Sequence, residues 1–127
     1  MSEVDPLDEI FVNSNEPADK KILAEIIKPF ATIDQKGIIA YTDKYEKLAE
    51  SKKGLVYMLC KKAMVMKGLS DVTEQTGVKE MVNGARISES NAKKSLFTYY
   101  KNIVRKGLIP SHCVKKAKEL IFEKDKK

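Results

Sequence analysis

Polar and basic side chains suited to binding a polyanion gather between Arg86 and Lys106. Apolar residues recur at helical spacing after Ser88, which predicts a helix with one apolar face and one polar face. Asn and Ser near the start of such a helix can bond to base edges, whereas Lys and Arg reach bases or phosphates. The candidate DNA-binding residues are Arg86, Ser88, Ser90, Asn91, Lys93, Lys94, Thr98, Lys101, Arg105 and Lys106.

Other chemistry has little support in the sequence. His112 is the only histidine, and adjacent side chains on a helix diverge by about 100°, which makes a nucleophile pair with Cys113 awkward. These two residues and Cys60 are too few for a closed zinc site. The glycines stand singly, so no phosphate-binding loop is present. We therefore expect no enzyme activity, no metal site and no cofactor, and we expect Cys60 to be a small buried apolar residue.

The net charge of +6 is unevenly distributed. Six acids and one lysine in residues 1–20 leave that segment at −5, while 23 basic and 12 acidic residues in the remainder give +11. Twelve basic and four acidic residues give +8 in residues 86–127 alone. A basic body with an acidic arm is typical of domains that bind polyanions, although Lys-rich surfaces also serve solubility.

The length of 127 residues predicts one domain over residues 18–127, preceded by a flexible acidic arm over residues 1–17. The longest apolar run, residues 55–60, is far too short to cross a bilayer. The acidic start of the chain has no secretory pattern, and two cysteines do not form a disulfide framework. These features predict a cytoplasmic protein without membrane contact.

The first half of the domain is predicted to hold a helix, a hairpin and a second helix. Apolar spacing from Ala18 predicts a helix that ends before Pro29. Two β-prone quartets, 30–33 and 38–41, flank a turn that contains Gly37 and predict a hairpin. The next helix begins at Thr42 or Asp43 and ends at Gly68, and Ser51 or Gly54 can divide it. Because its second half is apolar all round, we expect it to be the core helix.

The second half is predicted to be helical after a polar connector. A short helix surrounds Met81 and Val82, and a long helix runs from Ser88 to Gly107. Phe97 lies off the apolar stripe of that helix, and packing is its favoured role. The final helix begins near Ser111. The predicted fold class is therefore mainly α, with one short β-hairpin.

Residues 80–96 and 105–109 resemble the helix-turn-helix core of winged-helix DNA-binding proteins. From residue 80 to residue 109 the resemblance spans about a quarter of the chain, and over a third when residues 51–66 are taken as the supporting first helix. The matching features are an apolar pair, an apolar residue before a Ser N-cap, buried small and Leu positions, and a basic residue followed by Gly-Leu-Ile. They fall on Met81, Val82, Ile87, Ser88, Ala92, Leu96, Lys106, Gly107, Leu108 and Ile109.

The chain departs from the family pattern at three places. Arg86 stands at the turn position that usually takes Gly, the predicted second helix is one turn too long, and no strand pair for a β-wing follows Ile109. A competing register places the first helix and the turn over residues 69–78. It ranks second because Asn83 and Gly84 interrupt the recognition helix that would follow.

The resemblance implies sequence-specific binding to duplex DNA and a role in transcription regulation. Helix-turn-helix proteins commonly pair two half-sites, so a homodimer is expected, formed through the helix from Ser111 to Glu123 with help from Phe97 or the hairpin. Packing of that helix within its own chain is the alternative. A protein-interaction or assembly module and an RNA-binding or ribosome-associated factor are the alternative functions. The sequence identifies no small-molecule effector.

Overall fold

The computed structural model describes residues 20–69 and 73–122, so the predicted arm over residues 1–17 lies outside the described part of the chain. The described residues are mainly α-helical with one two-stranded antiparallel hairpin, as predicted. The elements are α1 (Lys20–Ile27), β1 (Ala31–Ile33), β2 (Ile39–Tyr41), α2 (Asp43–Glu46), α3 (Glu50–Met66), α4 (Val78–Met81), the π-helical turn η2 (Val82–Arg86), α5 (Glu89–Phe97), the 3-10 turn η3 (Ser111–Cys113) and α6 (Val114–Phe122).

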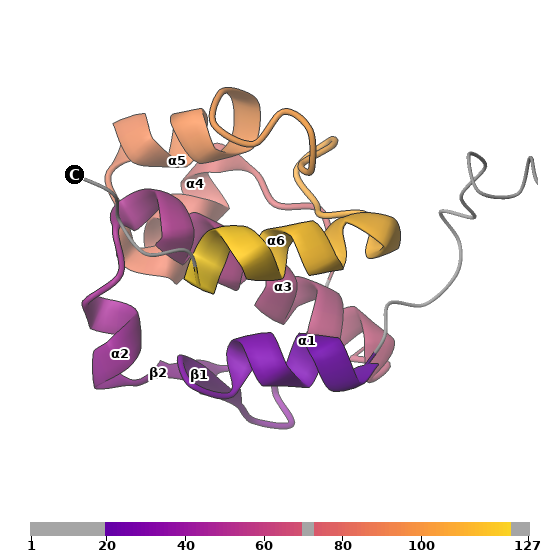
Figure 1. The fold of residues 1–127 in the computed structure, drawn as a ribbon. Helices are drawn as coiled ribbons and strands as arrows, with labels where there is room; N and C mark the ends of the chain where they lie inside the picture. Colours follow the sequence, from indigo (N-terminus) through magenta and orange to yellow (C-terminus); the bar gives the residue numbers. More distant parts are fainter. Residues whose placement is uncertain (1–19, 70–72, 123–127) are drawn as a thin grey trace, which may run out of the picture.

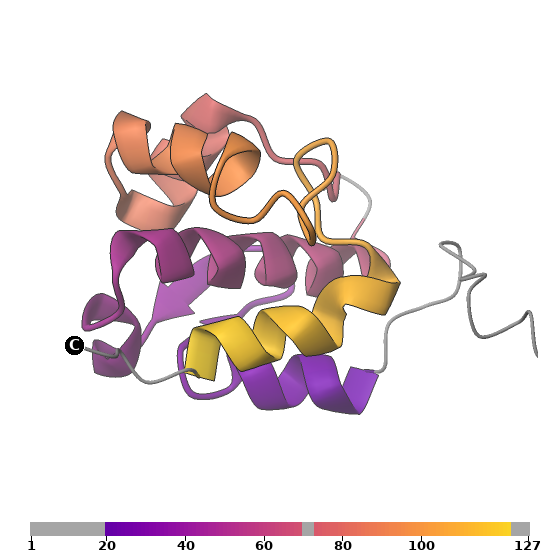
Figure 2. The same ribbon diagram turned by 45° about the horizontal axis from the view of Figure 1, so that its top comes forward.

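Helix α3 runs through the middle of the molecule, with α4 and α5 on one side and α1 and α6 on the other (Figure 1, Figure 2). All residues from Gly54 to Lys62 are buried. A helix that is buried all round must be covered by its own protein on every side. The prediction that this helix forms the core is confirmed.

The predicted hairpin is also confirmed. Ala31 pairs with Tyr41 and Ile33 with Ile39. Gly37 takes a φ of +86°, and the carboxylate of Asp34 accepts hydrogen bonds from the backbone N–H groups of Lys36 and Ile38. The side chain of Asp34 therefore stabilises the turn.

The predicted helix from Thr42 to Gly68 is divided, but before Ser51 and not at Ser51 or Gly54. Thr42 caps α2 by accepting a hydrogen bond from the backbone N–H of Tyr45, and Ala49 is extended before α3 begins. Tyr45 is fully buried, and its hydroxyl donates to the carbonyl of Ala85. Burial of this ring gives α2 a direction different from that of α3 (Figure 1).

The predicted long helix from Ser88 to Gly107 is wrong, because α5 ends at Phe97. Thr98 leaves helical geometry, and three consecutive β-branched or aromatic residues, Thr98 to Tyr100, have low helix propensity. Ile103 and Val104 are buried in the segment that follows. Thr98, Lys101 and Arg105 therefore do not share a helical face with Ser90 and Asn91.

Residues 105–108 form a two-residue hairpin turn. Arg105 and Leu108 exchange both backbone hydrogen bonds, at 2.8 and 3.1 Å. Lys106 and Gly107 have φ angles of +54° and +79°, the signs that a type I′ turn requires. Gly107 therefore lies in the turn of a minimal hairpin and does not end a helix. The single pair Arg105–Leu108 follows α5 at the place in the sequence where a winged-helix protein has its wing.

Helix α6 packs inside its own chain. Val114, Ala117 and Ile121 are buried, and Phe122 stacks on Phe30 with 5.6 Å between the ring centroids. The apolar side assigned to a dimer contact is thus covered by the protein itself, as in the alternative. No helix among the described residues is long and apolar enough to span a membrane.

Candidate nucleic-acid interface

Three helical segments form the scaffold of the candidate site: α3, the continuous α4 and η2, and α5. A Cβ atom added at Gly54 of α3 would lie 3.0 Å from the Ser95 hydroxyl of α5 and 3.2 Å from the sulfur of Met81. Ala92 is fully buried and Leu96 nearly so. The absence of a side chain at Gly54 thus allows α3 and α5 to approach closely.

A pair of stacked tyrosines holds the turn before α5. The rings of Tyr41 and Tyr45 lie 3.7 Å apart between centroids and 12° from parallel. Their hydroxyls donate to the carbonyls of Gly84 (2.7 Å) and Ala85 (2.5 Å). Burial raises the pKa of both phenols well above the usual range, so both remain donors. The hairpin and α2 thereby fix η2.

Arg86 occupies the left-handed region with a φ of +63°. This is the turn position that glycine usually takes in the family that the sequence resembles, so the backbone keeps the conformation although the residue differs. The guanidinium lies 5.5 Å from the centroid of Tyr41 and 3.8 Å from the carboxylate of Glu46. Its side chain is exposed but already engaged by a ring and an acid.

A network of hydrogen bonds holds the first turn of α5. The hydroxyl of Ser88, the predicted N-cap, accepts from the backbone N–H of Asn91 at 3.2 Å. One carboxylate oxygen of Glu50 accepts from the backbone N–H of Ser88 (3.0 Å) and from the side-chain amide of Asn91 (2.8 Å). These bonds lower the pKa of Glu50. Asn91 thus ties α5 to α3 and is half-buried.

Carboxylates surround this end of α5. Glu89 lies in the first turn and pairs with Lys93 at 3.2 Å, and both side chains are exposed. Glu50 and Glu46 contact Asn91 and Arg86 as described above. The N-terminal end of α5 is therefore electrostatically mixed and ill suited to approach by a phosphate.

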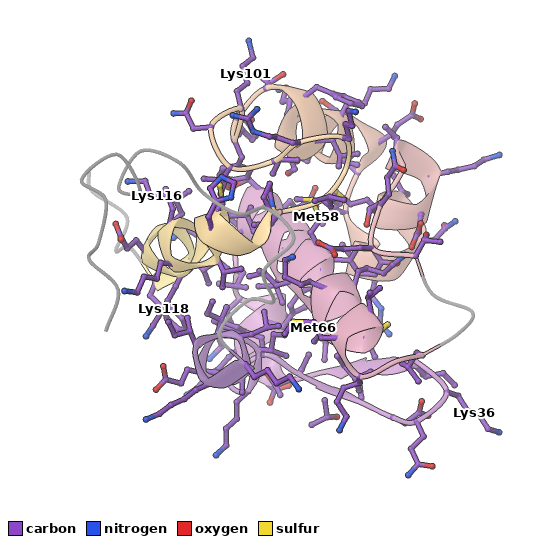
Figure 3. All side chains as sticks on the ribbon, turned by 90° about the vertical axis from the view of Figure 1, so that its right-hand side faces the viewer. Lys36, Met58, Met66, Lys101, Lys116 and Lys118 are labelled. Atoms are coloured by element: carbon purple, nitrogen blue, oxygen red, sulfur yellow. The ribbon has the colours of Figure 1, made fainter. Side chains whose placement is uncertain are left out.

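The other end of α5 and the loop after it are different. Four exposed basic residues, Lys94, Lys101, Arg105 and Lys106, form no ion pair with an acid anywhere in residues 20–69 and 73–122. Figure 3 shows Lys101 pointing away from the body of the molecule. Figure 2 shows the loop beside α5, on the same side of α3. We call these four residues the C-terminal basic surface.

Two exposed aromatic rings belong to the same region. Phe97 is 62% exposed and Tyr99 49% exposed. The expectation that Phe97 packs against the protein is therefore wrong. Tyr99 does not lie in the core either, although the predicted long helix placed it on the apolar face. Three aromatic residues within 97–100, directly before Lys101, were the signal in the sequence that could have identified them.

The loop is anchored to the connector before α4. The backbone N–H of Thr76 donates to the carbonyl of Gly107 at 2.7 Å, and a Cβ atom at Gly107 would lie 2.3 Å from the carbonyl oxygen of Thr76. The competing helix-turn-helix register requires a first helix that begins at Leu69. Residues 73–77 of the connector are not helical, so the described part of that segment lacks this helix.

Not every lysine contributes to the surface charge. Lys61 and Lys62 of α3 are buried. Lys61 pairs with Glu80, which also accepts from the hydroxyl of Tyr57, and Lys62 pairs with Glu74 at 2.8 Å. These two lysines link α3 to α4 and to the connector, so the number of lysines overstates the positive charge offered to a ligand.

The ten predicted residues thus divide between two places. Arg86, Ser88, Ser90, Asn91 and Lys93 lie at the start of α5, and Lys94, Thr98, Lys101, Arg105 and Lys106 lie at its end or in the loop. Sequence reasoning missed the contact of Glu50 with Ser88 and Asn91, and no local signal pointed to it.

The possible metal ligands in residues 20–69 and 73–122 are scattered. No three His, Cys, Asp or Glu side chains come together there as metal ligands. Cys60 is fully buried, as expected, and burial raises the pKa of its thiol to about 12. Comparison with models of protein families, with curated proteins and with solved structures finds no match to this chain.

Proposed function

We propose that this protein is a helix-turn-helix DNA-binding domain that acts in transcription regulation and binds duplex DNA through the C-terminal basic surface. The observation that carries the proposal is the group of four exposed cations without acidic partners, next to the helix in the recognition position. Each phosphate that they neutralise releases counterions, which favours binding.

The order and packing of α3, α4 with η2, and α5 support this proposal. In helix-turn-helix proteins the second helix of the motif lies in the major groove. Here α5 is that helix, and the minimal hairpin at Arg105–Leu108 follows it at the position of a wing. Lys106 at the tip of this hairpin is placed to contact the sugar-phosphate backbone.

The contacts at the start of α5 decide which residues remain for base recognition. Ser90 is exposed in the first turn, and Thr98 is exposed at the C-cap. Asn91 already donates its side-chain amide to Glu50. We therefore assign reading of base edges to Ser90 and Thr98, and a positioning role to Asn91. A homodimer would use a surface other than the apolar side of α6.

Salt titration with a matched pair of variants tests the proposal. Replacement of Lys94, Lys101 and Arg105 by Gln should reduce the slope of log K against log salt by about 2.7, because each lost phosphate contact removes about 0.9. The control variant replaces Lys36, Lys44 and Lys47 by Gln, which removes the same charge from the hairpin turn, α2 and the C-cap of α2. Figure 3 shows Lys36 far from Lys101.

The control variant should keep the wild-type slope apart from a small general charge effect. Circular dichroism verifies that both variants remain folded. Equal slopes for the two variants would contradict the assignment of the surface, and wild-type affinity that does not respond to salt would contradict nucleic-acid binding itself.

A second function is favoured by the exposed rings. Unpaired bases stack on aromatic side chains in proteins that bind RNA or single strands, and each stack is worth about 1–3 kcal/mol. Phe97 and Tyr99 are suited to this contact. If replacement of both by Ser weakens binding to single-stranded RNA more than to duplex DNA, and the wild type prefers RNA, the RNA-binding alternative replaces the first proposal.

A further inference from the structure

An apolar groove lies on the side of the molecule away from α5. It runs between α1, β1 and the last turn of α3, with a volume of about 480 Å³, and is lined by Leu23, Ile27, Ala31, Ile33, Ala63 and Met66, among others. A smaller hollow of about 250 Å³ shares Ile33, Ala63 and Lys67 with it and extends to Leu69. Figure 3 shows Met66 at the end of α3 that faces α1 and the hairpin.

Lysines line the groove. Lys20, Lys28 and Lys67 are exposed along it, and none of them pairs with an acid in the described ranges. Asp34 is the only acidic residue among those that line the groove or the hollow. The groove thus fits a ligand that combines apolar side chains with negative charge.

The chain itself contains a segment of that kind. Residues 1–19 hold six acids and no basic residue, and their one apolar cluster is Ile10-Phe11-Val12. Seven residues, and so eight steps between Cα atoms, separate Val12 from Lys20, which lines the groove. An extended chain of that length reaches up to about 26 Å. The cluster can therefore reach the groove without a change in the described fold.

We infer that the N-terminal segment docks in this groove, with Ile10, Phe11 and Val12 against the apolar lining and the neighbouring acids beside the three lysines. Covalent linkage raises the effective concentration of the segment to about the millimolar range, so a weak contact suffices for docking. This inference is independent of the proposed DNA binding, because the groove and α5 lie on different sides of α3.

The absence of tryptophan from the sequence provides a direct test in the full chain. Phe11→Trp creates a single reporter, whose emission should be that of a buried indole and independent of protein concentration. Addition of Ala24→Glu and Lys67→Glu, both at exposed positions that line the groove, should shift the emission to that of a solvent-exposed indole. Lys36→Glu controls for the change in charge, because Lys36 does not line the groove. Val4→Trp places the reporter in the same segment but outside the apolar cluster.

The inference is overturned if the Phe11→Trp emission is already that of an exposed indole. It is also overturned if the groove substitutions leave a buried emission unchanged. A buried emission that appears only at high protein concentration would assign the contact to a second copy of the chain. Because Ala24→Glu and Lys67→Glu act at exposed sites, an unchanged far-UV spectrum separates loss of docking from loss of fold.

Discussion

The two ends of α5 differ in what surrounds them. At the N-terminal end, Ser88, Asn91 and Glu50 share hydrogen bonds, and the tyrosine pair holds the preceding turn. At the C-terminal end, cations and two aromatic rings face solvent. Ser88, Asn91 and Glu50 at the first end satisfy one another, whereas the cations at the second end remain available. Residue type alone does not distinguish a side chain that binds a ligand from one that positions a helix.

The difference also separates stability from binding. At the N-terminal end, substitutions that remove these hydrogen bonds or add atoms to the tightly packed turn should lower the free energy of unfolding. Substitutions at the C-terminal end remove exposed charge or exposed rings, so they should change affinity with little effect on the fold. The following predictions test this division.

The largest effect is expected from Gly84→Ala. A Cβ atom at this position would lie 2.3 Å from the ring of Tyr57, so the ring or the turn must move. Overpacking of this kind should reduce the free energy of unfolding by about 2–3 kcal/mol, measured by urea denaturation. Gly77→Ala is the matched control, because nothing lies within 4 Å of the added atom. Equal losses in the two variants would contradict the tight contact at η2.

Tyr45→Phe should have the next largest effect. It leaves the buried carbonyl of Ala85 without its donor, at a cost of about 1–2 kcal/mol in the free energy of unfolding. Tyr99→Phe removes an exposed hydroxyl and should change stability by less than about 0.5 kcal/mol. Thermal unfolding measures the loss of stability in both variants. A larger loss for Tyr99→Phe than for Tyr45→Phe would contradict the division between the two ends of α5.

Asn91→Ala should cost about 1 kcal/mol of stability, because the side-chain amide bonded to Glu50 is lost. Sequence preference should remain unchanged, since this amide is already bonded to Glu50. Ser90→Ala should do the reverse and alter preference without loss of stability. Binding to a selected and a scrambled DNA site measures both. A loss of preference in Asn91→Ala would return this residue to base recognition.

The smallest effect is the pH dependence of the Glu50 contacts. Since the pKa of Glu50 is lowered in the folded state, its contribution to stability is present above the ordinary pKa of glutamate, about 4.3, and is lost as the pH falls through the lower, folded value. The wild type should therefore exceed Glu50→Gln in stability at pH 7, and the difference should shrink below about pH 4.3. A difference that persists unchanged at pH 2 would exclude the carboxylate as its source.

Much of the fold could be predicted because the local signals agree with the packing. Pro29 marks the end of α1, Gly37 marks the turn of the hairpin, and the apolar circumference of residues 55–66 identifies the core helix. Ser88 caps α5 as the sequence indicates. In each case a residue with a strong backbone preference stands at a boundary.

The errors come from contacts between distant residues. The apolar stripe continues past Phe97, but Ile103 and Val104 are buried from a non-helical segment, which periodicity does not distinguish from a longer helix. Asn91 has the chemistry of a base reader, and only the position of Glu50, 41 residues earlier, shows that it is engaged. The division of the site between two ends of α5 depends on both facts.

The central position of α3 has a consequence for how the chain folds. The segments before it and after it both pack on it, so neither half can bury its apolar residues without this helix. Side chains near its middle, such as Leu55 and Leu59, therefore belong to the nucleus that we expect to form in the folding transition state. Backbone amides of α3 should exchange with solvent only through global unfolding, while those of the exposed turn residues Lys101 and Lys106 should exchange through local opening. The exposed side chains that we assign to the ligand can thus adjust their conformation while Ile103 and Val104 stay in the core.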